Sequence, residues 1–176
     1  MTDYAGKFVD LIDKINTKVA SWFSLLVPIG VAVVVLDVGI RYFVPQYTLV
    51  WAFDLSWMLY SFYFMLAAGF TLLVKGHVRV DVIHNYWSRR TRAVIDIAYY
   101  LVFFVPIVVL IIIYGIPFAI DSIARQEVWM GAWLPPVYHM KTLIPVAFSL
   151  LLLQIISEII KCVKAFKDNP KESNKR

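Results

Sequence analysis

Residues 93–120 read AVIDIAYYLVFFVPIVVLIIIYGIPFAI, a run in which Asp96 is the single charged residue. A membrane-spanning helix needs about 20 predominantly apolar residues, so this run can cross a bilayer with some tilt or a bend. Three further runs have the same character, at residues 20–40, 49–74 and 142–163. Because lipid offers no partner to a backbone N–H or C=O group, each run is predicted to be an α-helix. The sequence therefore predicts an all-α membrane protein with four transmembrane helices.

The four runs take up most of the chain, which has 176 residues, 61% of them hydrophobic. A water-soluble domain of this size could not bury so much apolar surface. No room remains for a separate soluble domain. We therefore predict a single four-helix transmembrane domain over residues 1–176, in which residues 164–176 form a cytoplasmic tail.

Basic residues gather on one side of the four predicted spans. The chain has 17 lysines and arginines against 12 acidic residues, so its net charge is +5. Fourteen of the 17 lie in the N-terminal segment, the loop between the second and third spans, and the C-terminal segment: Lys7, Lys14, Lys18, Lys75, Arg79, Arg89, Arg90, Arg92, Lys161, Lys164, Lys167, Lys171, Lys175 and Arg176. Because positive residues favour the cytoplasmic side of a membrane, both termini and that loop are predicted to be cytoplasmic. The basic charge is thus explained by membrane topology, and no nucleic-acid partner is expected.

Two segments outside the spans have amphipathic patterns. In residues 4–22, apolar side chains recur every three or four positions, at Phe8, Ile12, Ile15, Val19 and Trp22. This pattern predicts an amphipathic helix that either lies in the inner membrane interface or extends the first span. Residues 121–141 mix tryptophans with charged residues and are predicted to form an interfacial segment between the third and fourth helices.

Charged and amide side chains inside apolar spans are costly, which makes the few that occur informative. Asp37 and Arg41 are four residues apart in the first span, and Asp54 lies near the start of the second. Since these spans form an antiparallel hairpin, the three side chains are predicted to form a local cluster; a proton or ion relay is the alternative. In the fourth span, Gln154 is predicted to hydrogen-bond to a neighbouring helix, and Glu158 and Lys161 to form an ion pair.

No constellation typical of catalysis occurs in the sequence. It has no phosphate-binding loop and no nucleophile with its base, and His77, His84 and His139 are far apart. We therefore predict no enzymatic activity, no cofactor and no metal site. No span carries a polar stripe that would line an aqueous path, although an autonomous small transporter or channel, working as a homo-oligomer, stays an alternative.

The sequence resembles one family of transporter subunits. The resemblance rests on Arg41-Tyr42-Phe43 at the end of the first span and on Trp51 and Asp54 at the start of the second. It continues with Gly69 and the string Lys75-Gly76-His77-Val78-Arg79-Val80-Asp81, then Lys141, Ile144-Pro145 and Leu153-Gln154. These motifs, spread over about residues 15–165, are similar to the small membrane subunit (DctQ- or SiaQ-like) of tripartite ATP-independent periplasmic (TRAP) transporters. Asp54 stands where that family more often has glutamate.

The resemblance implies a function and two protein partners. Such a subunit would be a scaffold in the bacterial inner membrane for a large (DctM- or SiaM-like) membrane subunit that moves substrate by a sodium-driven elevator motion. A periplasmic (DctP- or SiaP-like) binding protein would deliver an organic acid, such as a dicarboxylate or sialic acid. The residues implied in structure or in the partner interface are Arg41, Trp51, Asp54, Lys75, His77, Arg79, Asp81, Lys141 and Gln154. Those implied in contact with the binding protein are Gln46, Tyr47, Arg125, Glu127, Trp129 and Trp133.

Overall fold

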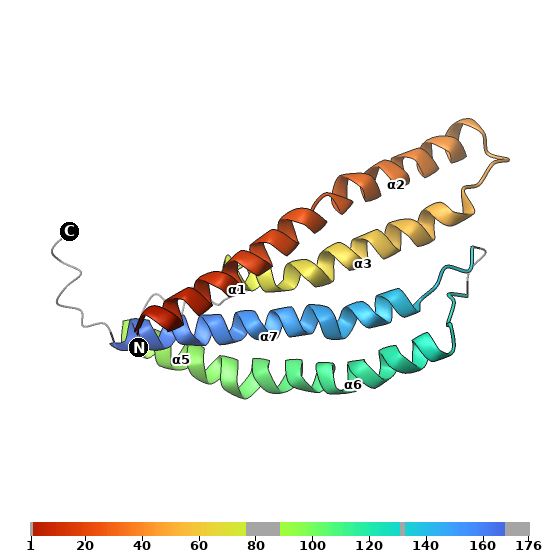
Figure 1. Ribbon diagram of the computed structural model, residues 1–176. Coiled ribbons are helices and arrows are strands. Elements are labelled where there is room, and N and C mark those ends of the chain that lie inside the picture. The colour runs from red at the N-terminus through yellow and green to blue at the C-terminus, as the bar shows by residue number, and fades with distance from the viewer. Residues whose placement is uncertain (1, 77–88, 131–132, 168–176) are drawn as a thin grey trace.

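The chain is a bundle of long helices that lie roughly side by side (Figure 1). This computed structural model describes residues 2–76, 89–130 and 133–167. The elements, in chain order, are α1 (Thr2–Phe23), α2 (Leu26–Phe43), α3 (Val50–Leu73), α5 (Arg89–Tyr99), the π-helical turn η1 (Tyr100–Phe104), α6 (Val105–Ala124) and α7 (Tyr138–Lys167). Within these described ranges, four helical stretches are long and apolar enough to cross a membrane, which confirms the predicted fold class.

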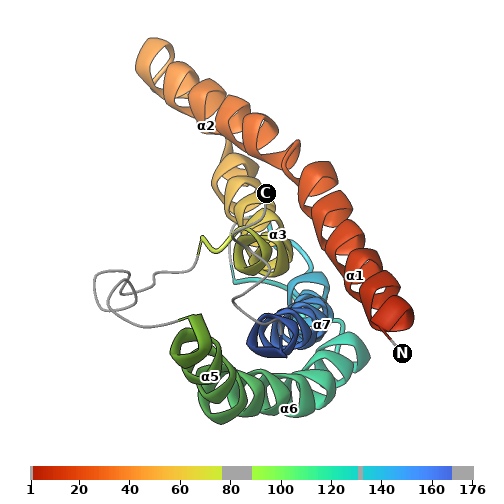
Figure 2. The ribbon, with the colours of Figure 1, turned by 90° about the vertical axis from the view of Figure 1, so that its left-hand side faces the viewer.

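α7 is the central helix of the bundle. It packs against α6 on one side and α3 on the other, and α1 and α5 also contact it (Figures 1 and 2). Two hydrophobic clusters hold these helices together. One contains Leu72, Val108, Leu151 and Ile155, and the other contains Leu66, Leu143 and Ala147. Because α7 contributes to both clusters, it joins α3 to the α5–α6 pair.

α1 and α2 form a nearly continuous rod, interrupted only at residues 24–25. Its stretch from Tyr4 to Phe43 has 40 residues, so it is about 60 Å long, twice the thickness of a hydrocarbon core of about 30 Å. α2 packs on α3, and none of the α2 residues is buried. α1 instead packs across α3 and α7, and apart from the break at residues 24–25 its helix runs on into α2. A position of α1 in the membrane interface stays a prediction.

The buried face of α1 differs from the predicted apolar stripe. Among the described side chains of α1, the buried ones are Val9, Ile12, Asn16 and Ala20, at spacings of three and four. Three members of the predicted stripe are exposed instead: Phe8, Ile15 and Trp22. The stripe was deduced from hydrophobicity alone, and the true face is centred on an asparagine.

The helix of the third span begins before the predicted apolar run, although its membrane-spanning stretch starts at Val94, and the helix contains a π-helical turn. α5 starts at Arg89, and η1 connects it to α6. The Val105 N–H group bonds the carbonyl of Tyr100, five residues back, just before Pro106, which has no N–H to donate. A π turn is a common accommodation beside such a proline. The ribbon curves through this region (Figure 2), as expected for a bend at a proline.

Apart from the breaks within the α1–α2 and α5–α6 rods, the helices begin and end toward the two opposite ends of the bundle. The start of α1, the start of α5 and the end of α7 lie together at one end, and α3 runs toward the same end but stops short of it (Figure 1). Consistently, a Cβ atom built on Gly6 would be 3.7 Å from the Lys164 ammonium. The described helices that lead into the three basic segments therefore all point toward one end, here called the basic end. The other end carries the α2–α3 and α6–α7 connections.

Candidate functional site

A buried polar cluster lies between α1 and α7 toward the basic end. Two of its side chains come from α1 and four from α7: Asp13, Asn16, Gln154, Ser157, Glu158 and Lys161. Three of these residues, Asn16, Gln154 and Ser157, are wholly buried. Buried polar groups are costly unless they bond one another, so the cluster links the two helices specifically. We call these six residues the inner cluster.

The Asp13 carboxylate is the centre of the inner cluster. It accepts hydrogen bonds from Gln154 Nε2 at 2.9 Å and Ser157 Oγ at 3.0 Å, and it pairs with Lys161 Nζ at 2.8 Å. Lys161 also pairs with Glu158 at 2.6 Å, which confirms the ion pair predicted in the fourth span. Gln154 does bond a neighbouring helix, as predicted, and the helix is α1.

The α1 half of this cluster was not predicted from the sequence. Asp13 and Asn16 stand among other charged residues of an N-terminal helix, where polar side chains usually face water. A signal was nevertheless present: Asn16 is four residues from both Ile12 and Ala20, so it lies on one face with them. A polar residue in the middle of an apolar face indicates a buried hydrogen bond.

A second polar cluster lies at the opposite end of the bundle. α6 ends in a Schellman motif, in which Gln126 has a positive φ of 46° and the Glu127 N–H bonds the Ser122 carbonyl at 3.1 Å. This turn brings the Glu127 carboxylate back to Ser122 Oγ, which donates to it at 2.8 Å. Lys141 of α7 donates to the same carboxylate, and its ammonium lies 4.1 Å from the centre of the Phe118 ring. We call Phe118, Ser122, Glu127 and Lys141 the outer cluster.

The outer cluster stabilises the charged form of Glu127. The hydrogen bonds from Lys141 and then Ser122 hold the pKa of Glu127 below its ordinary value. The backbone adds a further link, since the Val137 N–H bonds the Glu127 carbonyl at 2.9 Å. Lys141 therefore has a structural role at the α6–α7 connection, and the Glu127 carboxylate is already engaged within the chain.

The predicted group of Asp37, Arg41 and Asp54 forms in part. Arg41 pairs with Asp37 at 2.9 Å within α2, as the spacing of four predicts. Asp54 is buried on α3, at 8% exposure, and within the described part of the chain it joins no ion pair with Arg41. The pair thus belongs to one helix and does not tie the hairpin together.

The other predicted site residues are spread over the chain. Trp51, Tyr47 and Trp133 are exposed, and Gln46 lies in the exposed α2–α3 connection. Arg125 pairs with Asp121 at 2.9 Å. Trp129 packs on Trp57 of α3, with 5.1 Å between the ring centres. Lys75 ends α3 with a positive φ of 57°. Three predicted residues lie outside the described residues: His77, Arg79 and Asp81.

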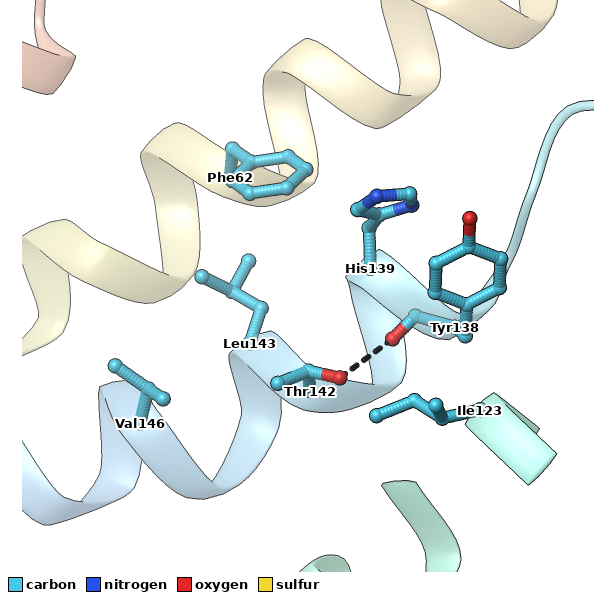
Figure 3. A pocket seen from close by; sticks show the side chains of 7 residues that line it. All are labelled: Phe62, Ile123, Tyr138, His139, Thr142, Leu143 and Val146. Atoms are coloured by element: carbon cyan, nitrogen blue, oxygen red, sulfur yellow. Dashed lines mark hydrogen bonds between the residues drawn. The ribbon is translucent and has the colours of Figure 1, made fainter. Parts of the chain in front are cut away.

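An apolar groove opens between α3, α6 and α7 near the outer cluster (Figure 3). Its volume is about 410 Å³, and its lining consists of Phe62, Ile123, Tyr138, His139, Thr142, Leu143 and Val146. The Thr142 hydroxyl donates to the Tyr138 carbonyl at 2.7 Å, so it is satisfied within α7. With no charged residue in its lining, the groove suits hydrocarbon better than an ion or a polar substrate.

The fold and these clusters define a multi-pass helical membrane protein whose buried polar groups connect helices of the same chain. Residues 30–165 match the family described as "Tripartite ATP-independent periplasmic transporters, DctQ component". The chain belongs to this family of transporter components. The match covers most of the chain and confirms the resemblance seen in the sequence. No curated protein and no solved structure is similar enough to the chain to refine this assignment.

Proposed function

We propose that this chain is the small scaffold subunit of a sodium-coupled TRAP transporter that takes up organic acids. The observation that carries the proposal is the match to the DctQ component family over residues 30–165. Substrates of the proposed class are dicarboxylates and sugar acids such as sialic acid. The chain would support a large elevator-type membrane subunit (DctM- or SiaM-like), and a periplasmic binding protein (DctP- or SiaP-like) would deliver the substrate.

The arrangement of charge supports a defined orientation in the bacterial inner membrane. Fourteen of the 17 basic residues lie in the N-terminal segment, the loop between the second and third spans, and the C-terminal segment. The described helices next to these segments point toward the basic end of the bundle (Figure 1). By the positive-inside rule, that end would face the cytoplasm with both termini. The opposite end, with Gln46, Tyr47, Arg125, Trp129 and Trp133, would then face the periplasm, where a binding protein docks.

The packing of α2 supports a scaffold role. α2 is apolar along most of its length, about 27 Å by helix geometry, and none of its residues is buried within the chain. Such a surface is available to a membrane partner or to lipid. At the basic end, Lys75, His77, Arg79 and Asp81 are proposed to pack against the large subunit.

The first experiment is a pull-down of the tagged chain from its native membrane in mild detergent, followed by mass spectrometry. A stoichiometric, much larger polytopic protein is expected to accompany it. Recovery of this chain alone, as a stable homo-oligomer, would contradict the proposal and favour an autonomous transporter or channel.

A second experiment tests coupling and substrate class. Proteoliposomes would contain the large subunit with or without this chain, together with the binding protein and a labelled dicarboxylate or sialic acid. Uptake is expected only with this chain present and only with an inward sodium gradient. Equal uptake without this chain would refute its role in transport, and uptake independent of sodium would refute the proposed coupling.

A further inference from the structure

α1 contacts both halves of the bundle. On one side it packs against α3, which carries α2, and on the other against α7, which carries α5 and α6 (Figure 2). Asn16 stands where the three helices meet: its Nδ2 donates to Gln154 of α7, and its other face lies against Gly69 of α3. The side chain is wholly buried, so both contacts are shielded from solvent.

The charge on Asp13 fixes the direction of the hydrogen bonds that reach Asn16. A carboxylate can only accept, so Gln154 must present Nε2 to Asp13, at 2.9 Å. Gln154 Oε1 is then left to accept, and Asn16 Nδ2 donates to it at 2.9 Å. The remaining atom, Asn16 Oδ1, is therefore directed away from α7 and toward α3.

Gly69 is the residue that accommodates this oxygen. Asn16 Oδ1 is buried and has no conventional hydrogen-bond donor among the residues that the structure describes. A Cβ atom built on Gly69 would lie 2.2 Å from Oδ1 and 2.9 Å from Cγ of Asn16. The oxygen thus occupies the space that a side chain at position 69 would fill. It lies against the glycine backbone, whose Cα–H is a weak hydrogen-bond donor.

This arrangement permits a single register of α1. A shift of one residue rotates the helix by about 100°, and a shift of one turn moves it by about 5.4 Å, so either would break every bond of the chain Asp13–Gln154–Asn16. An apolar face would tolerate such slippage more readily. A buried asparagine is known to fix the register of packed helices at a cost in stability.

We propose that α1 is a cross-brace that sets the position of the α2–α3 hairpin relative to α7 and α6, and that Asp13, Asn16 and Gly69 are its positioning residues. Asp13 orients the side-chain amides of Gln154 and Asn16. Asn16 fixes the rotation of α1, and Gly69 leaves the space on α3 that Asn16 Oδ1 occupies. The proposal concerns this chain alone, so its test is independent of the transport function proposed above.

The test measures a distance between the two halves in the full chain. Spin labels would be placed at Leu36 of α2 and Ile113 of α6, which are 58% and 55% exposed, in a Cys162→Ala background. In lipid nanodiscs, pulsed electron paramagnetic resonance is expected to give one narrow distribution of distances between the two labels. Loss of the brace is expected to broaden it or to add a second peak.

Matched variants separate the brace from general effects. Asp13→Asn and Asn16→Leu are expected to broaden the distribution with helix content unchanged by circular dichroism. Asp10→Asn removes the same charge from an exposed position of α1 and is expected to leave the distribution narrow. A merely local loss of stability would not move the two labels apart.

Two results with the charge variants would overturn the proposal. One is a distribution for Asp13→Asn that superposes on the native one, and the other is equal broadening by Asp10→Asn. Asp13→Asn is isosteric and keeps the test decisive if Asn16→Leu does not fold. Asn16→Gln adds a second check: it keeps the amide but adds one methylene, so a narrow native distance in that variant would also contradict the fit on Gly69.

Discussion

Replacement of Gly69 by alanine probes the contact between α1 and α3. The new methyl carbon would lie 2.2 Å from Asn16 Oδ1, whereas real Cβ atoms essentially never approach another heavy atom within 3.0 Å. The asparagine is wholly buried and bonded to Gln154, so it has little freedom to move aside. Either α1 is displaced or the hydrogen bond to Gln154 breaks.

Three contributions determine how much Gly69→Ala is expected to change the free energy of unfolding. Overpacking typically costs about 1–3 kcal/mol. Loss of an interhelical hydrogen bond in a membrane protein adds about 0.6 kcal/mol on average. Alanine is favoured over glycine within a helix by about 0.8–1 kcal/mol, which offsets part of this. We therefore expect Gly69→Ala to lower the free energy of unfolding by about 0.5–3 kcal/mol.

Gly39→Ala is the matched control, since a Cβ atom at Gly39 of α2 would have nothing within 4 Å. This variant is expected to be neutral or up to about 1 kcal/mol more stable. The assay is unfolding of the purified full chain in mixed micelles with increasing SDS, followed by circular dichroism.

A double variant isolates the proposed contact. In an Asn16→Ala background the clashing oxygen is gone, so Gly69→Ala is expected to lose its cost. The reasoning is refuted if Gly69→Ala and Gly39→Ala have equal effects. It is refuted equally if the cost of Gly69→Ala is unchanged in the Asn16→Ala background, because the coupling between the two sites would then be zero.

Three further variants test other parts of the chain. Lys75→Gly, at a φ of 57°, is expected to stabilise the chain by roughly 0.5–1 kcal/mol in the same SDS assay, whereas Lys75→Ala, which loses the same charge, should give no gain. Glu127→Gln should unfold at a lower temperature than the native chain at pH 7. Hydrogen bonds from Lys141 and Ser122 lower the pKa of Glu127 in the folded chain. The contribution of the charged carboxylate to stability is therefore complete above its ordinary pKa of 4.5 and is lost as the pH falls through the lowered value. The unfolding temperatures of the two chains should accordingly converge as the pH falls below 4.5. Asp54→Ala should reduce the yield of complex with the large subunit without changing the sodium dependence of uptake; a large change in that dependence would place Asp54 in the ion path.

Hydrophobicity predicted the spans well because lipid imposes a simple rule on every residue that it touches. The expected runs at 49–74 and 142–163 correspond to α3 and α7, which is longer at both ends. The connection between α5 and α6 was harder to foresee. A proline in a span indicates a bend. Whether the helix accommodates that proline by a π turn or by another local geometry depends on the packing around residues 100–104.

Polar contacts were predicted where a polar residue stood out against an apolar background. Gln154 was recognised because it is an amide within an apolar span. Its partner Asn16 was not, because α1 mixes charged and apolar residues and its hydrophobic pattern indicated a different face. Pairing within a helix, as for Asp37 and Arg41, follows from spacing alone. The position of Asp54 depends on how two helices are rotated about their axes, which spacing does not specify.

The separation of the two polar clusters bears on whether this chain could conduct an ion by itself. Lys141 of the outer cluster and Gln154 of the inner cluster both lie on α7, about 20 Å apart along its axis at about 1.5 Å per residue. Between them, the buried residues Leu143, Ala147 and Leu151 belong to the hydrophobic clusters that join α7 to its neighbours. An ion or proton that left one cluster would have to cross this apolar packing, where an unpaired charge is strongly disfavoured. Conduction along α7 would therefore need these helices to separate, and the proposed brace holds α3 and α7 together.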